Sequence, residues 1–559
     1  MKIKTAILNL YILFLGITSY TQSLAEPPEP ELGQRWIINP LLSDEFNDTA
    51  LDESKWFNFH PMWDGRPPAK FMPSSVSVNN GKAQIRASLL DTPDRNFTIA
   101  GGAIRSRNEA KFGYYEASMK ASKINMSSTF WMSNNSTPLI GPNNQAIDCI
   151  SDQWSLELDI IESVGGTIQQ AWGKSFRTTQ NYNTHVHYKT CNGGHANYSA
   201  GVHATEGNGA NAISNELPGG QEVWQDYNTY AVWWKNANDA DFYLNNTLSG
   251  QVEFNRDLLQ EPFSREMAIN LVMETYDWAT PYPSANELAN NAINTTYYDW
   301  VRSYELIAAD DDAPVYQSSV IKNPGFEYGN LDHFRTWGDK HEIEQTHVNS
   351  GQYAVKIRGQ SGLEYYAAVQ KNTNYRLSVY ALVNRGKLSL GAKPISFNQQ
   401  PWFGETAQYS TSGQYQRVDF MFNSGDQHSV KFFVVASDGA EFYIDDFELE
   451  ALDYLEPVAT NASDIFDEQF TVKSFSRHQN GLDVRFTYKS DKDIYAKLAV
   501  FTGNRVIRRG VHLKAGYGHV QKHFDIDNFD NINASGFRLN MRSADTNTWL
   551  YSTEIIDFH

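Results

Sequence analysis

Short runs of alternating apolar and polar residues fill most of this 559-residue chain and constrain its fold more than any other feature. Runs such as SVSVNNGKAQIRAS, FGYYEASMKAS and TYAVWWKNANDADFYLNN are separated by turns rich in Asn, Gly and Asp. A period of two places successive side chains on opposite faces of a strand, and no sustained helical period accompanies it. The sequence therefore predicts an all-β protein, and the aromatic content of 13% agrees with this because aromatic residues are enriched in strands.

Two breaks divide the chain into three β-rich blocks. The segment AADDDAPVY, at 308–316, is acidic and contains proline, and EPVATNASD, at 456–464, forms the second break. A chain of this length is too long for a single core. We predict a many-stranded β-sandwich over residues 26–308, followed by two smaller β-sandwich domains. These span 315–455 and 464–559, and the sequence assigns no role to the last one.

The first 25 residues have the layout of a secretory signal peptide. Lys2 and Lys4 precede an apolar run from Ala6 to Ile17, and Ser23-Leu24-Ala25 resembles a cleavage site. A membrane anchor is the alternative, but the apolar run falls short of the ~20 residues that a span needs. We expect a secreted protein, extracellular or periplasmic, without a membrane partner.

The two cysteines, Cys149 and Cys191, are candidates for one disulfide in an exported chain. Two free buried thiols are the alternative, and the spacing fits no metal or redox motif. The chain carries 46 Lys and Arg against 65 Asp and Glu, a net charge of −19. Since phosphate backbones are bound by clustered cations, this charge argues against nucleic acid. It also disfavours a highly sulfated polysaccharide, unless a local basic groove overcomes the global charge.

The stretch WSLELDIIESVGG, Trp154 to Gly166, carries three acids in an apolar run: Glu157, Asp159 and Glu162. Alternation places Glu157 and Asp159 on one face of a strand, and Glu162 joins them only if the strand contains a β-bulge. Two carboxyl groups on one face suit retaining glycoside hydrolysis, and a third acid can hold their pKa values apart. A solvated strand face with scattered acids is the alternative.

The segment ELDIIE matches the Glu-x-Asp-x-x-Glu signature of glycoside hydrolase family 16 in its β-bulge form. Three further segments also resemble that family: LLSDEFNDTALDESKW, GGAIRSRNEAKFGYYEASMKASKINMSSTFWM and YYDWVRSYEL. The resemblance covers residues 36–306, and its segments follow one another in the order typical of the family. The resemblance implies a β-jelly-roll with a concave substrate cleft. It implies Glu157 as nucleophile, Asp159 as its supporting acid and Glu162 as general acid/base.

Five further residues are candidates for substrate binding. Tryptophan faces can stack on sugar rings, arginines can contact hydroxyl or sulfate groups, and one histidine resembles a family histidine near the cleaved bond. For each of them, an ordinary core or surface position is the alternative. The candidates are Trp63, Arg66, Arg105, Trp131 and His185. No cofactor is expected for catalysis, and a zinc site at His185 and His187 would need a third ligand that the sequence does not reveal.

The substrate follows from finer resemblances. GRPP and LVMETYDW resemble agarase-like galactanases more than β-glucanases, and the net charge of −19 favours neutral or sparsely sulfated chains. We predict a secreted, endo-acting, retaining hydrolase of β-1,4-galactosidic bonds in the red-algal galactan agarose. The alternatives are a hydrolase of furcellaran or a related hybrid β/κ-carrageenan, a β-1,3-glucanase (laminarinase) and a non-catalytic glycan-binding protein.

The middle block resembles a carbohydrate-binding module of the jelly-roll kind in NPGFEYGNLDHFRTWG and FYIDDFELE. Such a sandwich would bind a polysaccharide through aromatic side chains or hold a structural Ca²⁺ ion. A spacer without a ligand is the alternative. We expect the protein to be a monomer.

Overall fold

The structure is a computed structural model of the chain. It describes residues 26–134, 137–138, 153–167, 176–189, 195–199, 213–256, 259–314, 316, 321–338, 341–398, 401–409, 413–437, 439–453, 465–503 and 505–558. The predicted signal peptide at 1–25 and the disulfide candidates Cys149 and Cys191 lie outside the described residues. Within these ranges, no helix has the length and apolar character needed to cross a bilayer.

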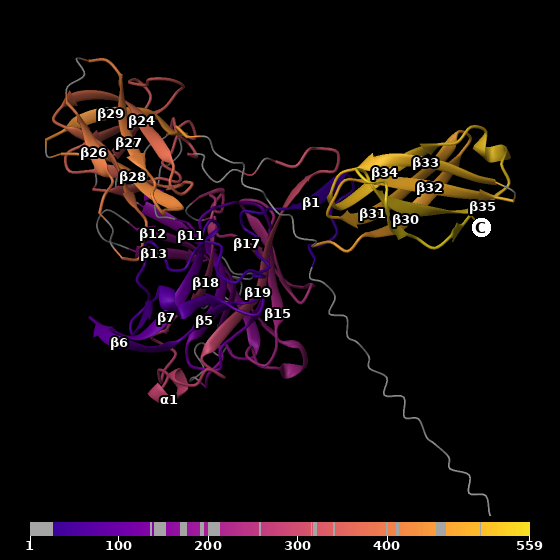
Figure 1. The fold of residues 1–559 in the computed structure, drawn as a ribbon, viewed down its shortest axis with the longest axis horizontal. Coiled ribbons are helices and arrows are strands. Elements are labelled where there is room, and N and C mark those ends of the chain that lie inside the picture. The colour runs from indigo at the N-terminus through magenta and orange to yellow at the C-terminus, as the bar shows by residue number, and fades with distance from the viewer. Residues whose placement is uncertain are drawn as a thin grey trace, which may run out of the picture.

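Nearly every described element is a β-strand, which confirms the predicted all-β class (Figure 1). The one described α-helix, α1 (Ala285–Leu288), is a single turn whose first residues are held by a capping box between Ser284 and Glu287. Short 3-10 turns occupy Pro73–Ser75, Pro218–Gly220 and Phe529–Asn531.

Two large, mostly antiparallel sheets form the first block. The first sheet runs, in hydrogen-bonding order, through β17 (Thr247–Glu253), β16 (Asp239–Leu244), β15 (Asn228–Trp234), β8 (Gly113–Lys120), β19 (Thr295–Ala308), β1 (Gln34–Ile38), β34 (Gly516–Asp525), β31 (Gly481–Ser490) and β30 (Gln469–His478), with β5 (Ala83–Arg86) and β4 (Val76–Val78) beside β19. The second runs through β13 (His195–Ser199), β12 (Thr179–Lys189), β11 (Gln153–Val164), β9 (Ser127–Ser133), β18 (Ala268–Met273), β7 (Phe97–Ser106) and β2 (Trp56–Phe57), with β10 (Thr137–Pro138), β14 (Ile213–Glu216), β3 (Ala69–Phe71) and β6 (Ser88–Asp94) at its margins.

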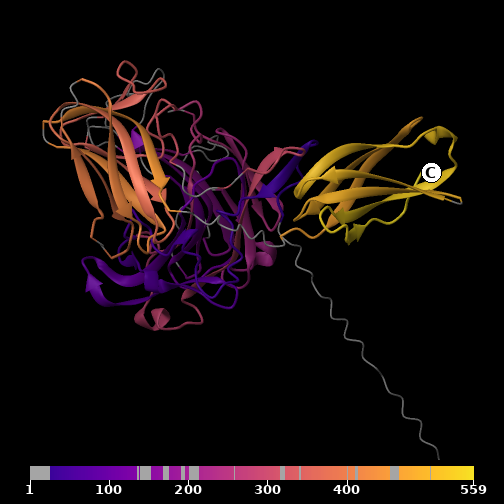
Figure 2. The ribbon, with the colours of Figure 1, turned by 45° about the horizontal axis from the view of Figure 1, so that its top comes forward.

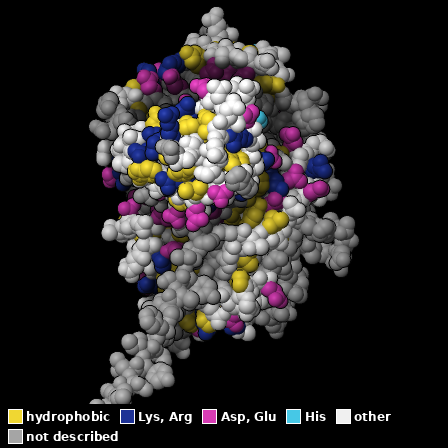
Figure 3. All heavy atoms as spheres, turned by 90° about the vertical axis from the view of Figure 1, so that its right-hand side faces the viewer, with side chains coloured by type: hydrophobic (Ala, Val, Ile, Leu, Met, Phe, Trp, Pro, Cys, Tyr) yellow, Lys and Arg dark blue, Asp and Glu magenta, His cyan; other side chains and the backbone are white. Residues whose placement is uncertain are grey.

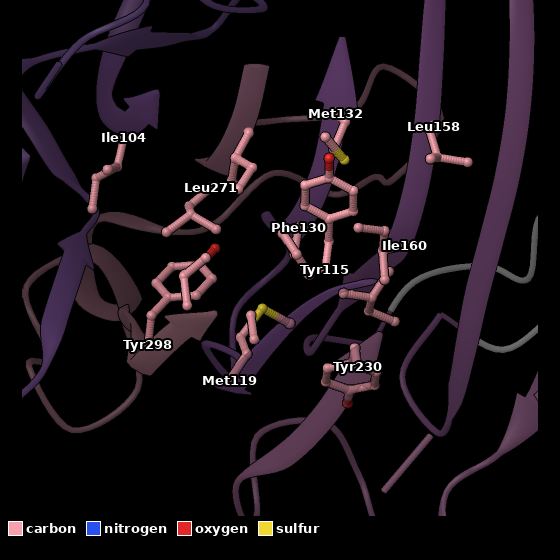
Figure 4. Packing of buried hydrophobic residues seen from close by; sticks show 14 of the residues in the cluster. Ile104, Tyr115, Met119, Phe130, Met132, Leu158, Ile160, Tyr230, Leu271 and Tyr298 are labelled. Atoms are coloured by element: carbon pink, nitrogen blue, oxygen red, sulfur yellow. The ribbon is translucent and has the colours of Figure 1, made fainter. Parts of the chain in front are cut away.

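One apolar core lies between these two sheets. Strand alternation directs every second side chain of each sheet into it, and the two sets interdigitate (Figure 4). The first sheet contributes Tyr115, Met119, Tyr230 and Tyr298, and the second contributes Ile104, Phe130, Met132, Leu158, Ile160 and Leu271. The opposite face of the second sheet is left for polar and functional side chains.

The second block is a separate sandwich of two five-stranded sheets (orange, Figures 1 and 2). One sheet consists of β20 (Arg335–Trp337), β23 (Gly362–Ala368), β28 (Ser429–Ala436), β25 (Leu388–Pro394) and β26 (Gly404–Gln408). The other consists of β21 (His341–Glu344), β22 (Ala354–Arg358), β29 (Glu441–Ala451), β24 (Asn374–Arg385) and β27 (Gln416–Asn423).

Polar contacts, one of them made by a buried arginine, join this sandwich to the first block. Arg265, 4% exposed, pairs with Asp332 at 2.8 Å, and Arg107 donates to the Oγ atom of Ser429 at 2.7 Å. Lys322 also contacts the carboxylate of Glu266. Since a buried arginine without its partner is costly, these contacts hold the two blocks in one arrangement.

The C-terminal block does not form an independent pair of sheets. Its strands β30, β31 and β34 extend the first sheet of the first block, because β34 pairs with β1 from Gln34↔His519 to Trp36↔Tyr517. The remaining strands form its own sheet: β33 (Arg505–Leu513), β32 (Ile494–Thr502), β35 (Ala534–Ser543), β36 (Trp549–Ser552) and β37 (Ile556–Asp557). The two layers enclose a separate core, at the end of the molecule away from the second block (yellow, Figures 1 and 2).

Buried side chains of β1 strengthen this junction. Arg35, 2% exposed, donates to the carbonyl oxygens of Ala309 at 3.1 Å, Asp311 at 2.6 Å and Ala515. Its neighbour Trp36 is fully buried in a cluster that contains residues of both blocks, namely Tyr114, Ala231, Tyr243, Tyr304, Ile465, Phe466 and Tyr517. The first and third blocks therefore share both a sheet and a small core.

Replacing Trp36 with alanine should lower the free energy of unfolding by about 3–5 kcal/mol, because it empties the centre of this shared cluster. Denaturant unfolding monitored by circular dichroism would measure the loss. Trp549→Ala is the matched control, because Trp549 is 54% exposed and its removal should cost less than about 0.5 kcal/mol. Equal effects of the two substitutions would contradict the shared core.

Candidate active site

Strand β11 contains the predicted β-bulge. Its pairing with β9 shifts register between Asp159 and Ile161, and its pairing with β12 shifts between Asp159 and Glu162. Ile160 and Ile161 are consecutive, yet both are fully buried in the core. After two inward residues, Glu162 returns to the face that carries Glu157 and Asp159. The bulge therefore places the three carboxylates on one face, opposite the core.

Glu157 is held as an anion by histidines on the neighbouring strand. The Nε2 atom of His187 lies 3.0 Å from its Oε2 atom, and His185 lies directly opposite Glu157 in the β11–β12 register. Burial alone would raise the pKa of Glu157, but the hydrogen bond and charge of His187, with the charge of His185, lower it to about 2. An ionised carboxylate that is 30% exposed is suited to act as a nucleophile.

The pKa of Asp159 is shifted in the opposite direction to that of Glu157. Burial raises its pKa well above the usual value, and the charges of Glu157 and Glu162 raise it further. Its side chain is 6% exposed and hydrogen-bonds Glu157. A carboxyl group that keeps its proton donates this hydrogen bond and so stabilises the ionised neighbour.

The hydrogen-bond partner of Glu162 comes from a distant part of the chain, the segment after β18. The hydroxyl of Tyr276 donates to its Oε1 atom at 2.8 Å. The guanidinium of Arg66 lies 5.3 Å from the Tyr276 ring and donates to Glu274 at 3.1 Å. Burial raises the pKa of Glu274 to about 8, although Arg66 opposes the shift.

Tyr276 and Glu274 were not predicted as site residues. Both follow β18 in the segment LVMETYDW, more than a hundred positions after Glu162. Tyr276 contacts Glu162, and Glu274 senses its charge, because β18 pairs with β9, which pairs with β11. No local pattern signals this contact, whereas the NYNTHVHY motif did place His187 beside His185 on one face.

The other predicted binding residues lie on or near the same face. Trp131 is opposite Asp159 in register, and Trp63 packs edge-on against Phe71 at 4.9 Å. Arg105 is 3% exposed and donates to Asn270 at 2.6 Å, so it braces the sheet. Contact between Arg105 and substrate stays a prediction that this buried position does not favour.

One set of potential metal ligands coincides with the site. The ligand atoms of Glu157, Asp159 and His185 lie within 4.8 Å of one another. Oxygen and imidazole ligands of this kind could hold a cation, but the described residues offer only three of them. The expectation that catalysis needs no metal stays a prediction.

A groove between the first and second blocks begins beside this site. It has a volume of about 660 Å³ and contains Trp63, which lies 6.0 Å from the Arg66 guanidinium, and Trp402 of the second block, 57% exposed. Four cations line the groove and one lining residue is acidic. The cations are Lys70, Arg95, Lys393 and Lys431, and the acid is Asp64.

Two of these cations belong to the second block and form ion pairs with the same carboxylate, that of Glu364. Lys431 pairs with Glu364 at 2.9 Å, and Lys393 lies 3.7 Å from the same side chain. Lys393 also lies 5.0 Å from the ring centre of Trp402. Lys70 pairs with Asp94 at 2.6 Å and Arg95 with Asp64 at 2.9 Å, so each cation of the groove has a carboxylate partner. An excess of one positive charge remains beside aromatic rings from two blocks, which is a suitable arrangement for an anionic sugar.

Comparison with known proteins agrees with this geometry. Residues 36–306 match the family model described as "Beta-porphyranase A-D, GH16 domain", and residues 318–440 match a model described as "Carbohydrate binding domain". "Beta-porphyranase E" of Zobellia galactanivorans is 43% identical over 280 residues, which are 50% of this chain and 91% of the relative. "Beta-porphyranase B" of Phocaeicola plebeius is 34% identical over 332 residues, 55% of this chain and 100% of the relative.

Agarases are among the more distant relatives, such as "Beta-agarase AgaB34" of Agarivorans albus, 24% identical over 52% of this chain and 61% of the relative. Among solved structures, that of the β-porphyranase BpGH16B from the human gut bacterium Bacteroides plebeius is 35% identical. It covers 50% of this chain and 95% of its own, with a TM-score of 0.44.

The fold and the carboxylate site define a glycoside hydrolase. The chain belongs to glycoside hydrolase family 16 and carries a carbohydrate-binding domain after its family 16 domain. The family resemblance and the appended module predicted from the sequence are confirmed.

Asp159 should tolerate replacement by asparagine better than by alanine. If its carboxyl group is protonated, the amide of Asp159→Asn still donates a hydrogen bond to Glu157, and kcat should stay within about tenfold of wild type. Asp159→Ala removes the donor and should lower kcat about a hundredfold. Steady-state hydrolysis assays would measure both variants, and equal losses would rule out the donor role.

His187→Gln should shift the acid limb of the pH profile of kcat/KM. Because His187 lowers the pKa of Glu157 to about 2, its removal lets that pKa rise toward 4.5, and activity should be lost at a higher pH. The matched control is His347→Gln, an exposed histidine of the second block. An acid limb that does not move would contradict the coupling between His187 and Glu157.

Proposed function

We propose that this chain is a secreted, endo-acting, retaining hydrolase of β-1,4-galactosidic bonds in an agar-type red-algal galactan. The observation that carries the proposal is the bulged strand, which brings Glu157, Asp159 and Glu162 onto one face. Relatives between 28% and 43% identical are named β-porphyranases, and others at 24–25% are named agarases. These names support a galactan as the substrate class.

The proposed roles follow from the electrostatics of the three acids. Glu157, ionised beside His187, attacks the anomeric carbon and forms a glycosyl-enzyme, while Glu162 protonates the departing oxygen. Asp159 donates a hydrogen bond to Glu157 in the free enzyme. In the second step Glu162 accepts a proton from the water that releases the sugar, and Tyr276 orients Glu162 through its hydroxyl.

Porphyran, which carries sulfate esters, is the substrate that we favour over neutral agarose. The sequence alone favoured agarose because the net charge is −19, but that average conceals the cationic groove beside Trp63. Its four cations pair with three carboxylates, Asp64, Asp94 and Glu364, which leaves an excess of one positive charge in the groove, and salt screens charges beyond about 8–10 Å. Agarose is the second candidate, on account of the relatives named agarases.

The test is hydrolysis of porphyran, agarose, furcellaran, κ-carrageenan and laminarin in parallel, with sizing of the products. Porphyran should be cleaved fastest, and internal cuts should yield intermediate lengths early. Proton NMR should show that new reducing ends appear first as the β anomer. Early α anomer would exclude retention, and faster cleavage of agarose would replace porphyran as substrate.

The same assay tests the catalytic residues. Glu157→Gln and Glu162→Gln should each lower kcat at least about a thousandfold, because each removes a group that reacts with the substrate. Glu253→Gln is a matched control, since Glu253 is an exposed residue of β17, at the edge of the other large sheet. Near wild-type rates in either active-site variant would refute the assigned roles.

A further inference from the structure

The C-terminal sheet has one face that packs on a core and one that does not. Leu498, Val500, Leu539 and Met541 point into the core of the C-terminal block. The alternate residues of β32 and β35 point away from it. The block lies outside residues 36–306 and 318–440, the two ranges that match family models.

Strand register arranges the outward side chains in rows. His512 on β33 lies opposite Tyr495 on β32, which lies opposite Arg542 on β35, which lies opposite Trp549 on β36. At about 4.8 Å per strand, this row spans about 14 Å across the sheet. A parallel row places Arg508, Ala499 and Arg538 side by side, and Lys497 lies between the rows.

Aromatic rings and cations are in contact along these rows. The guanidinium of Arg542 lies 4.4 Å from the centre of the Trp549 ring, and Arg538 lies 5.5 Å from that of Phe501. Tyr495 meets His512 edge-on at 5.4 Å. Trp549 is 54% exposed and Tyr495 is 39% exposed, so both rings present surface to the solvent.

The cations of this face are not neutralised by carboxylates. Among the described residues of the C-terminal block, no ion pair includes Lys497, Arg508, Arg538 or Arg542. His512 is the member of the face that lies near a carboxylate, 3.8 Å from Asp493. Figure 3 shows this end of the molecule, where Lys, Arg and hydrophobic side chains intermingle on the block and acidic ones lie mostly around it. Such an uncompensated cluster is unusual in a chain with a net charge of −19.

We propose that this cationic aromatic face, formed by Tyr495, Lys497, Arg508, His512, Arg538, Arg542 and Trp549, binds a sulfated polysaccharide chain. Sugar rings stack on the exposed faces of Trp549 and Tyr495, and sulfate esters pair with the arginines between them. The choice of a sulfated galactan as ligand rests on the proposed function. The face is then a second polysaccharide-binding site, apart from the carbohydrate-binding domain at 318–440.

The attachment of the block makes such a site useful to the enzyme. Because β34 continues the catalytic sheet through β1, the face has a set position relative to the active site. A polysaccharide held there raises the local concentration of bonds near Glu157 and Glu162. Long chains should benefit and short oligosaccharides should not.

The test measures binding by the full-length chain carrying Glu157→Gln, which prevents hydrolysis. Affinity electrophoresis through gels containing porphyran, desulfated porphyran or agarose gives the dissociation constants. The charge variant adds Arg508→Gln, Arg538→Gln and Arg542→Gln, and the aromatic variant adds Tyr495→Ala and Trp549→Ala. The matched control removes the same charge elsewhere, with Arg86→Gln, Lys111→Gln and Arg256→Gln.

Both variants of the face should bind porphyran at least tenfold more weakly than the parent, and the control should stay within twofold. Thermal unfolding of all four proteins should coincide. Desulfated porphyran should bind more weakly, and the charge variant should not weaken it further. For the hydrolysis assay, the three arginine substitutions are made in a chain that keeps Glu157. This chain should hydrolyse short galactan oligosaccharides at the wild-type rate.

Unchanged porphyran binding in both variants would overturn the proposal, and so would a loss in the charge variant alone, since stacking would then play no part. Equally tight binding of the parent to duplex DNA or anionic lipid vesicles would overturn the assignment to a polysaccharide. If the wild-type chain hydrolyses no galactan while the variants still lose binding, the proposed function fails and the face stands. If the wild-type chain hydrolyses galactan normally while the variants bind it as tightly as the parent, the proposed function stands and the binding face fails.

Discussion

One extra residue in β11 is the constraint on which the active site depends. Ile160 and Ile161 are both buried in the core, so the strand departs from alternation at that point. Without the departure, Glu162 would point into the apolar core, where an unpaired carboxylate is strongly unfavourable. The core therefore stabilises the bulge, because it accepts two isoleucines and excludes the acid. Catalytic geometry in this sheet follows from side-chain packing on its opposite face.

Three carboxylates on one face must differ in protonation, and their neighbours decide which of them stays charged. His187 and His185 stabilise the anion of Glu157, whereas burial and the charges of Glu157 and Glu162 raise the pKa of Asp159 well above its usual value. Tyr276 donates to Glu162. The surrounding residues thus assign different chemical tasks to groups of nearly identical intrinsic acidity.

The appended blocks are joined to the catalytic one by two different means. The second block is held by polar contacts such as Arg265 with Asp332, and its interface leaves a groove lined by rings and cations. The third block shares a sheet, in which β34 hydrogen-bonds to β1, and a cluster around Trp36. Both attachments place the proposed sugar-binding surfaces in defined positions around one active site.

The sequence by itself determined the all-β class, the family, the three carboxylates and the need for a bulge, because these depend on local period and spacing. Tertiary structure alone decided that Tyr276 contacts Glu162, since strands distant in sequence become neighbours only when the sheet forms. It also decided that Arg105 is buried and that the third block extends the catalytic sheet. The net charge of −19 suggested a neutral substrate, yet folding gathers cations into a groove and onto one sheet face. Charge acts over short distances in salt water, so its placement in space, which composition does not contain, governs what the protein binds.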